Sequence, residues 1–270
     1  DILFIKYLYL GMFGASFSIA IFYFSCFLFV LWFFVFKSEL KLKTRHFKFN
    51  IPIVKEITEL SFVTFSRQGV VSILSIILNH TLYTYGGEHS VAIYGIISRM
   101  LMFALFPILG ITQGFLPIAG FNYGAGNYSR VKESVQLSIQ YAAILATLIF
   151  VVILIFAKPI VAVFTTDPLV IDQTPEALRW VFAASPIIAV QLIGAAYFQA
   201  AGKAKKALLL TLSKQGFFLI PLVLILPNFL GIFGVWIAFP IADILSTILT
   251  GYFLKKEMNT KLIQTNDGIL

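Results

Sequence analysis

The chain has 270 residues, of which 59% are hydrophobic and 12% are charged, and its formal net charge is +8 at pH 7. A soluble domain carries about twice that share of charged residues, and the mean hydropathy is +0.93. Its apolar runs are unbroken rather than alternating, which argues against a β-barrel. Because every backbone group inside lipid must be bonded internally, the composition predicts an all-α polytopic membrane protein.

Seven apolar segments are long enough to cross a bilayer. The polar stretch at 37–55 separates the first segment from the other six. We therefore expect four parts: a helix at 1–36, a basic linker at 37–55, a six-helix lobe at 56–256 and a tail at 257–270. The predicted spans are 12–36, 57–84, 91–113, 131–157, 176–200, 207–226 and 232–254.

The first and last spans open with nearly the same sequence. Residues 10–14 read LGMFG and residues 230–234 read LGIFG, and each begins a long apolar run that ends in lysine. Internal repeats of this kind are typical of secondary transporters. Because the chain starts at Asp1 rather than Met, we expect it to be the back half of a longer protein.

Lysine and arginine gather on one side of the predicted spans. If the spans alternate in direction, the linker, the loop after the third span, the turn after the fifth and the tail share one face. That face carries 14 basic residues, whereas the other carries Lys6, Lys158 and Arg179. The excess of basic residues predicts that the linker and the tail are cytoplasmic, in a multi-pass protein of the cell membrane. The linker is expected either to lie on the inner leaflet or to form a solvated hinge.

A stripe of polar residues follows one face of the second span. Such a stripe must face protein or water rather than lipid. It indicates either the wall of a substrate cavity or hydrogen bonding between helices. Gln68, Ser72 and Asn79 are our candidate cavity residues, joined by Arg99 of the third span and Gln191 of the fifth. The stripe consists of Ser61, Thr64, Gln68, Ser72, Ser75 and Asn79.

Asp243 is the strongest candidate for a carboxylate well inside a span. It indicates either an ion relay or a structural ion pair with an arginine, for which Arg67 and Arg99 are the candidates. Lys214 of the sixth span is expected to extend to the inner surface. Pro240 and Pro186 are expected to bend their helices.

Glycine and asparagine cluster at 113–127, where the third span ends. We expect this segment to shape an inner gate through Gly114, Pro117, Gly120, Asn122 and Gly124. It is not a phosphate-binding loop, because it lacks the Gly-Lys-Ser/Thr ending.

The sequence carries no ATP-binding motif, no catalytic arrangement and no metal-ligand spacing among its histidines and Cys26. It therefore predicts no enzyme activity, no metal and no cofactor. Transport would have to draw on an ion gradient or on another chain.

Three segments together resemble the multidrug and toxic compound extrusion (MATE) family. They are QGFLPIAGFNYGAGNYSR at 113–130, FQAAGKAKKALLLTLSKQ at 198–215 and GVWIAFPIAD at 234–243. The resemblance implies twelve helices in two six-helix lobes, of which this chain would hold the last helix of the first lobe and the whole second lobe. The missing amino-terminal lobe would then be needed to complete the transporter.

The resemblance also implies a function. The family exports small organic drugs, mostly cations, in exchange for protons or sodium. In one branch the ion site uses acidic residues in helices seven and ten. This chain departs from that pattern, because Arg67 and Gln68 lie at the matching depth and the fifth span has only Glu176, at its outer end. We therefore expect coupling mainly in the missing lobe.

The leading hypothesis is multidrug efflux by a secondary-active transporter, with membrane lipids and drugs as partners and no nucleic acid. A flippase for lipid-linked saccharides is the first alternative, because Arg67 and Arg99 could face an anionic headgroup. A non-transporting membrane subunit is the second, should the chain be naturally truncated.

Overall fold

The computed structural model describes residues 3–7, 9–38 and 51–266, and these are helical apart from short turns. The chain divides into two units, residues 1–59 and residues 60–270. Among the described residues, six helices are long and apolar enough to cross a membrane. The first unit contains the π-helix η1 (Leu3–Tyr7) and α1 (Gly11–Phe36). Most of the predicted linker, residues 39–50, lies outside the described residues.

Helix α2 (Ile51–Gly124) is interrupted at Gly87, where φ is 67° and ψ is −166°. Glycine tolerates this backbone conformation because it has no Cβ. Leu74 and Leu101 lie on either side of this break, yet both line the same cavity. In a straight helix they would be about 40 Å apart. The two arms of α2 therefore fold back on each other at Gly87.

The middle of the second unit contains α3 (Tyr128–Phe164), α4 (Pro168–Val181), the 3-10 turn η3 (Ser185–Ile187) and α5 (Ile188–Ala200). Asp167 caps α4, because its side chain accepts a hydrogen bond from the Leu169 amide at 3.0 Å. Pro186, where we expected a bend, lies in the 3-10 turn at which the helix is interrupted between α4 and α5.

The last part of the unit contains α6 (Ala204–Leu212), the π-helix η4 (Ser213–Leu219), α7 (Ile220–Ile225), α8 (Pro227–Leu230) and α9 (Ile232–Asn266). The helix continues through Pro240, and the bend that we expect there stays a prediction. The π-helical segment in the predicted sixth span was not expected.

The two LGxFG motifs adopt related local structures. Gly11 and Gly231 have positive φ angles of 51° and 58° immediately before the helices that follow them. A Cβ on Gly14 would lie 3.0 Å from the Phe4 carbonyl oxygen, and one on Gly234 would lie 2.7 Å from the Leu226 carbonyl oxygen. In each repeat, the second glycine therefore allows close contact with the backbone of the preceding segment.

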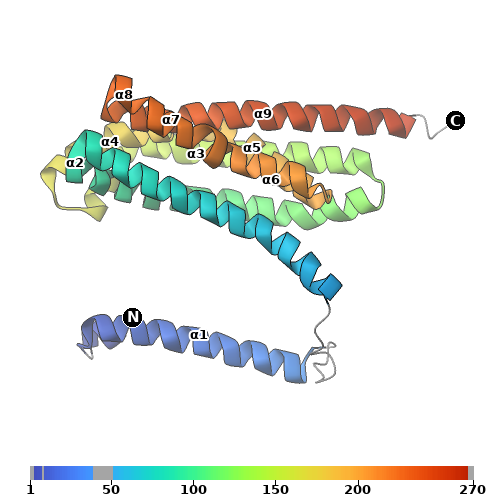
Figure 1. Ribbon diagram of the computed structural model, residues 1–270, viewed down its shortest axis with the longest axis horizontal. Helices are drawn as coiled ribbons and strands as arrows, with labels where there is room; N and C mark the ends of the chain where they lie inside the picture. The colour runs from blue at the N-terminus through green and yellow to red at the C-terminus, as the bar shows by residue number, and fades with distance from the viewer. Residues whose placement is uncertain (1–2, 8, 39–50, 267–270) are drawn as a thin grey trace. The chain divides into compact units, whose positions relative to one another are not determined.

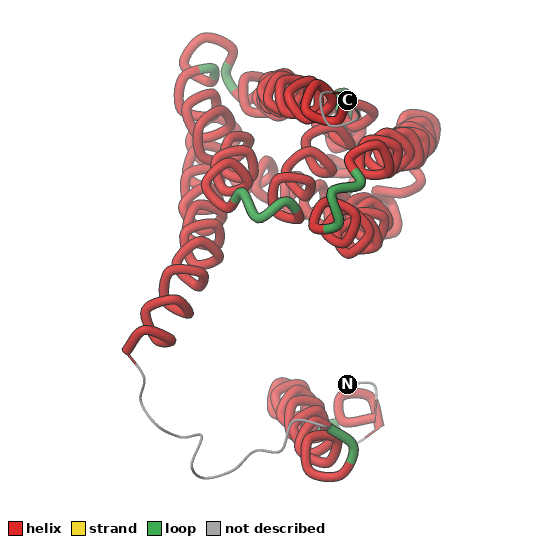
Figure 2. The backbone as a smooth tube through the Cα atoms, turned by 90° about the vertical axis from the view of Figure 1, so that its right-hand side faces the viewer, coloured by secondary structure: helices red, strands yellow, loops and turns green. Residues whose placement is uncertain are grey.

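The long helices of the second unit pack side by side around an apolar core (Figures 1 and 2). The bend at Gly87, the 165–167 loop and the Gly231 turn lie at one end, here called the Gly87 end. The 125–127 and 201–203 turns lie at the other, here called the basic end. There Glu257 of α9 pairs with both Lys203 and Lys206, which connects α9 to the start of α6.

Charge differs sharply between these ends. Loops and helix ends at the Gly87 end carry Lys158 and Arg179 together with Glu88, Asp167, Asp172 and Glu176. The basic end instead carries a strong excess of positive charge. Its basic residues are Arg130, Lys132, Lys203, Lys205, Lys206, Lys255 and Lys256.

Candidate functional site

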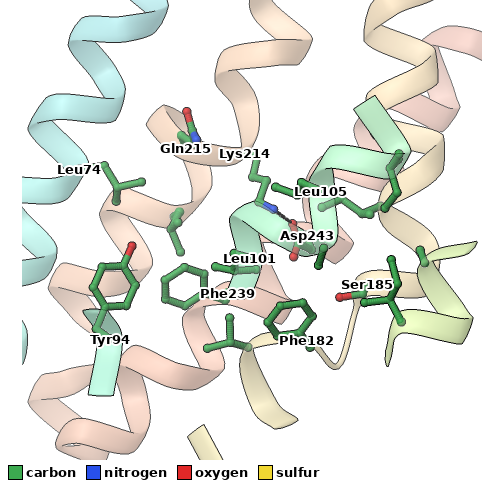
Figure 3. A pocket seen from close by; sticks show the side chains of 17 residues that line it. Leu74, Tyr94, Leu101, Leu105, Phe182, Ser185, Lys214, Gln215, Phe239 and Asp243 are labelled. Atoms are coloured by element: carbon green, nitrogen blue, oxygen red, sulfur yellow. Dashed lines mark ion pairs between the residues drawn. The ribbon is translucent and has the colours of Figure 1, made fainter. Parts of the chain in front are cut away.

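A cavity of about 150 Å³ lies inside the second unit, between both arms of α2, α3, the α4–α5 break, η4 and α9 (Figure 3). Most of its lining is aliphatic or aromatic, including Leu74, Leu101 and Phe239. A small polar group interrupts this apolar wall. Its members are Tyr94, Ser185, Lys214, Gln215 and Asp243.

Lys214 and Asp243 form an ion pair at this cavity. The Lys214 Nζ lies 2.5 Å from the Asp243 Oδ1, and the two side chains point toward each other (Figure 3). The exposed fraction is 19% for the lysine side chain and 6% for the aspartate. A buried charge is tolerated only when it has a partner, so the lysine compensates the aspartate here.

The partner of Asp243 differs from the one that we expected. Arg99 is exposed, and the side chain of Arg67 lies outside the described part of the chain. Lys214 also differs from expectation, because its ammonium group meets Asp243 rather than extending to the inner surface. The physical reason is η4: Lys214 is its second residue, and a π-helix turns side chains through smaller steps than an α-helix.

The predicted cavity residues do not line this cavity. Gln68, Ser72, Asn79 and Arg99 are exposed on the second unit. Gln191 is buried, with 4% exposure, and its Nε2 donates to the Leu210 carbonyl oxygen at 3.3 Å. In this structure Gln191 therefore links α5 to α6.

The predicted gate segment borders a second, open groove of about 600 Å³ between the end of α2 and the start of α3. Gly114 and Asn122 line it together with Arg130 and Glu133. A Cβ on Gly120 would lie 3.7 Å from the Ala200 carbonyl oxygen, so this glycine faces the end of α5. Pro117 and Gly124 lie in the same part of α2 and are exposed.

Comparison with known proteins identifies the family. The sequence model of the MatE family matches residues 67–225, which is more than half of the chain. The chain belongs to the MATE family. Among the described residues, no cluster of three histidine, cysteine or acidic side chains could hold a metal ion.

Two curated relatives carry different names. "Multidrug export protein MepA" of Staphylococcus haemolyticus (strain JCSC1435) is 25% identical over 253 residues, which cover 93% of this chain and 55% of the relative. The "FAD transporter" of Shewanella oneidensis (strain MR-1) is 25% identical over 170 residues, which cover 63% of this chain and 38% of the relative.

A solved structure confirms the fold. The structure of a multidrug resistance MATE family transporter in an outward-facing conformation superposes with a TM-score of 0.85 at 24% identity. The match covers 97% of this chain and 59% of the transporter. This chain therefore spans a little over half the length of the staphylococcal relative and of this transporter.

Lys214 is the site residue whose role the sequence did not indicate. Its position near a cluster of lysines favours a surface location, and no periodic signal marks η4 as a π-helix. Ser185 and Tyr94 were also missed as cavity residues, because each lies in an apolar segment without a polar stripe. Only the broken α4–α5 helix, signalled by Pro186, could have drawn attention to Ser185.

Proposed function

We propose that this chain supplies the carboxy-terminal lobe, and the helix before it, of a secondary-active multidrug exporter. The exporter would exchange organic compounds, mostly cations, for protons or sodium. The observation that carries this proposal is the family match, together with the similarity of 93% of the chain to a protein named as a multidrug exporter. A second lobe, not contained in this chain, would complete the transport pathway.

In this proposal the chain crosses the membrane seven times. The candidate span Gln68–Gly124 contains 57 residues, and as one straight helix it would be about 85 Å long, nearly three times the thickness of a bilayer core. The reversal at Gly87 supports two crossings instead. The excess of lysine and arginine at the basic end supports a cytoplasmic location for that end.

The polar face of α2 would line the cleft between the lobes. Gln68, Ser72 and Asn79 are exposed on the second unit by itself. The hydroxyls of Ser72 and Ser75 donate to backbone carbonyls one turn earlier, whereas Gln68 and Asn79 have larger side chains with amide donors and acceptors. An exposed polar face on a membrane helix is best accommodated against water or another protein surface.

Drug resistance in cells tests this role of α2. The natural-length gene product, expressed in a drug-sensitive host, should raise the inhibitory concentrations of several organic cations. Replacing Gln68 and Asn79 with leucine should change which drugs are resisted while the amount of protein in the membrane stays the same. Unchanged resistance to every drug would remove the polar face from the mechanism, and no resistance even with the unaltered protein would contradict the proposed function.

Transport of a larger anionic metabolite is a second candidate. It is favoured by the relative named as an FAD transporter, which matches 63% of this chain. Accumulation of flavin outside cells that express the protein, without any drug resistance, would favour this candidate over the first.

A further inference from the structure

Asp243 is a buried carboxylate at the edge of a cavity, and Lys214 is its partner there. Its Oδ1 is buried and makes an ion pair with Lys214, yet it accepts no hydrogen bond of regular geometry. A buried carboxylate oxygen is normally satisfied by hydrogen-bond donors. Here the carboxylate instead borders a cavity whose other titratable groups are Lys214 and Tyr94. The charge of this buried carboxylate is therefore balanced by one tethered ammonium group, with open cavity space beside the pair.

The Lys214 side chain is flexible and not fully enclosed. It is a four-carbon chain with 19% exposure, and Lys214 follows the basic end, at Lys203–Lys206, by about two to three helical turns. Lysine side chains in membrane helices reach the interface readily when they lie near a helix end. A rotation of the side chain toward the basic end would take the ammonium group away from Asp243.

We propose that Asp243 is a binding site for a monovalent cation, a proton or Na⁺, at which the Lys214 ammonium group is a tethered competitor. In the present structure the lysine occupies the site. When a cation binds Asp243, Lys214 moves toward the basic end and water. As the source of the driving ion, this site rests on the proposed function, but cation binding itself can be measured without transport.

The surroundings of Lys214 connect this site to the polar face of α2. Gly216, two residues after Lys214 in η4, packs against α2: a Cβ on Gly216 would lie 3.4 Å from the Val70 Cγ1. Val70 is two residues from Gln68. Movement of Lys214 would therefore act on η4 and, through this contact, on the helix that carries the predicted cavity residues.

Thermal unfolding of the purified natural-length protein in detergent tests the site. Sodium replaces choline at constant ionic strength in one series, and the pH is lowered without sodium in the other. A cation that binds only the folded protein raises the unfolding midpoint. We expect a rise in one series for the unaltered protein. In Lys214→Gln, the same rise should need about tenfold less cation, because the competing charge is gone.

Asp243→Asn should abolish the rise. Since this variant leaves Lys214 unpaired, the double variant Lys214→Gln/Asp243→Asn provides the same comparison without a lone charge. The control is Lys158→Gln, which removes an ion pair to Asp172 whose side chains are 65% and 78% exposed. This variant should leave the cation response unchanged.

The proposal would be overturned if added cation raised the unfolding midpoint of the unaltered protein no more than that of the double variant, or if the double variant kept the full rise. It would also be overturned if Lys214→Gln needed as much cation as the unaltered protein. The sodium and proton series separate the two ions. Cation binding without any drug efflux would support the cation site and contradict the proposed function. Failure of the site and failure of the proposed function are therefore distinguishable.

Discussion

At the scale of single residues, small side chains determine how closely the helices approach. Gly194 of α5 faces Thr250 of α9, and a Cβ at this glycine would lie 2.4 Å from the Thr250 Cγ2. Thr250 is fully buried. Glycine at such a crossing lets the backbone of one membrane helix contact a side chain of the other. Close packing of this kind holds helices together in lipid, where no hydrophobic driving force acts between them.

Gly194→Ala should therefore destabilise the protein by about 1–3 kcal/mol, the usual cost of overpacking a close contact. Adding Thr250→Ser removes the clashing methyl group and should recover part of the loss. Gly110→Ala is the matched control, since a Cβ there meets nothing within 4 Å. Unfolding midpoints in detergent measure all three variants. Equal midpoints for Gly194→Ala and Gly110→Ala would show that the crossing is looser than the structure indicates.

The residue scale also marks the limit of sequence-based prediction. Asp243 could be identified because a carboxylate inside an apolar span is conspicuous. Its partner could not, because Lys214 and Asp243 are 29 positions apart and meet only through the geometry of η4. The polar face of α2 was found by its helical period, but a period does not say whether that face points into the lobe or away from it.

At the scale of elements, the repeated LGxFG motif sets the junction between α8 and α9. A Cβ on Gly234 would lie 2.6–2.8 Å from backbone atoms of Leu226 and Pro227. Backbone atoms cannot rotate aside as a side chain does, so the junction itself would have to open. Most span positions were predictable because long apolar runs have clear ends, whereas the division of the fifth and sixth spans into shorter helices depends on local hydrogen bonding.

We predict that Gly234→Ala costs at least about 3 kcal/mol, at the upper end of overpacking effects. Gly95→Ala, with nothing within 4 Å of its added Cβ, should be neutral or stabilising. The yield of folded protein and its unfolding midpoint report the difference. If Gly234→Ala folds as stably as Gly95→Ala, the close junction does not exist in solution.

At the scale of the whole molecule, the unequal charge of the two ends predicts the orientation in the membrane. Cys26 is the chain's single cysteine, so Cys26→Ala, together with replacement of any cysteine outside this chain in the natural-length protein, gives a background for labelling. Thr166→Cys at the Gly87 end should react with a membrane-impermeant maleimide in intact cells. Ser129→Cys at the basic end should react only after the cells are opened. Both positions are exposed. The reverse pattern would place the basic end outside.

Gradient-driven export is the central claim, and vesicle efflux tests it most directly. Vesicles that hold the natural-length gene product would be loaded with a fluorescent organic cation, and a proton gradient and then a sodium gradient would be imposed. The account predicts loss of dye that depends on one of these gradients and stops when the gradient is collapsed. Folded protein that releases no dye under either gradient would contradict it.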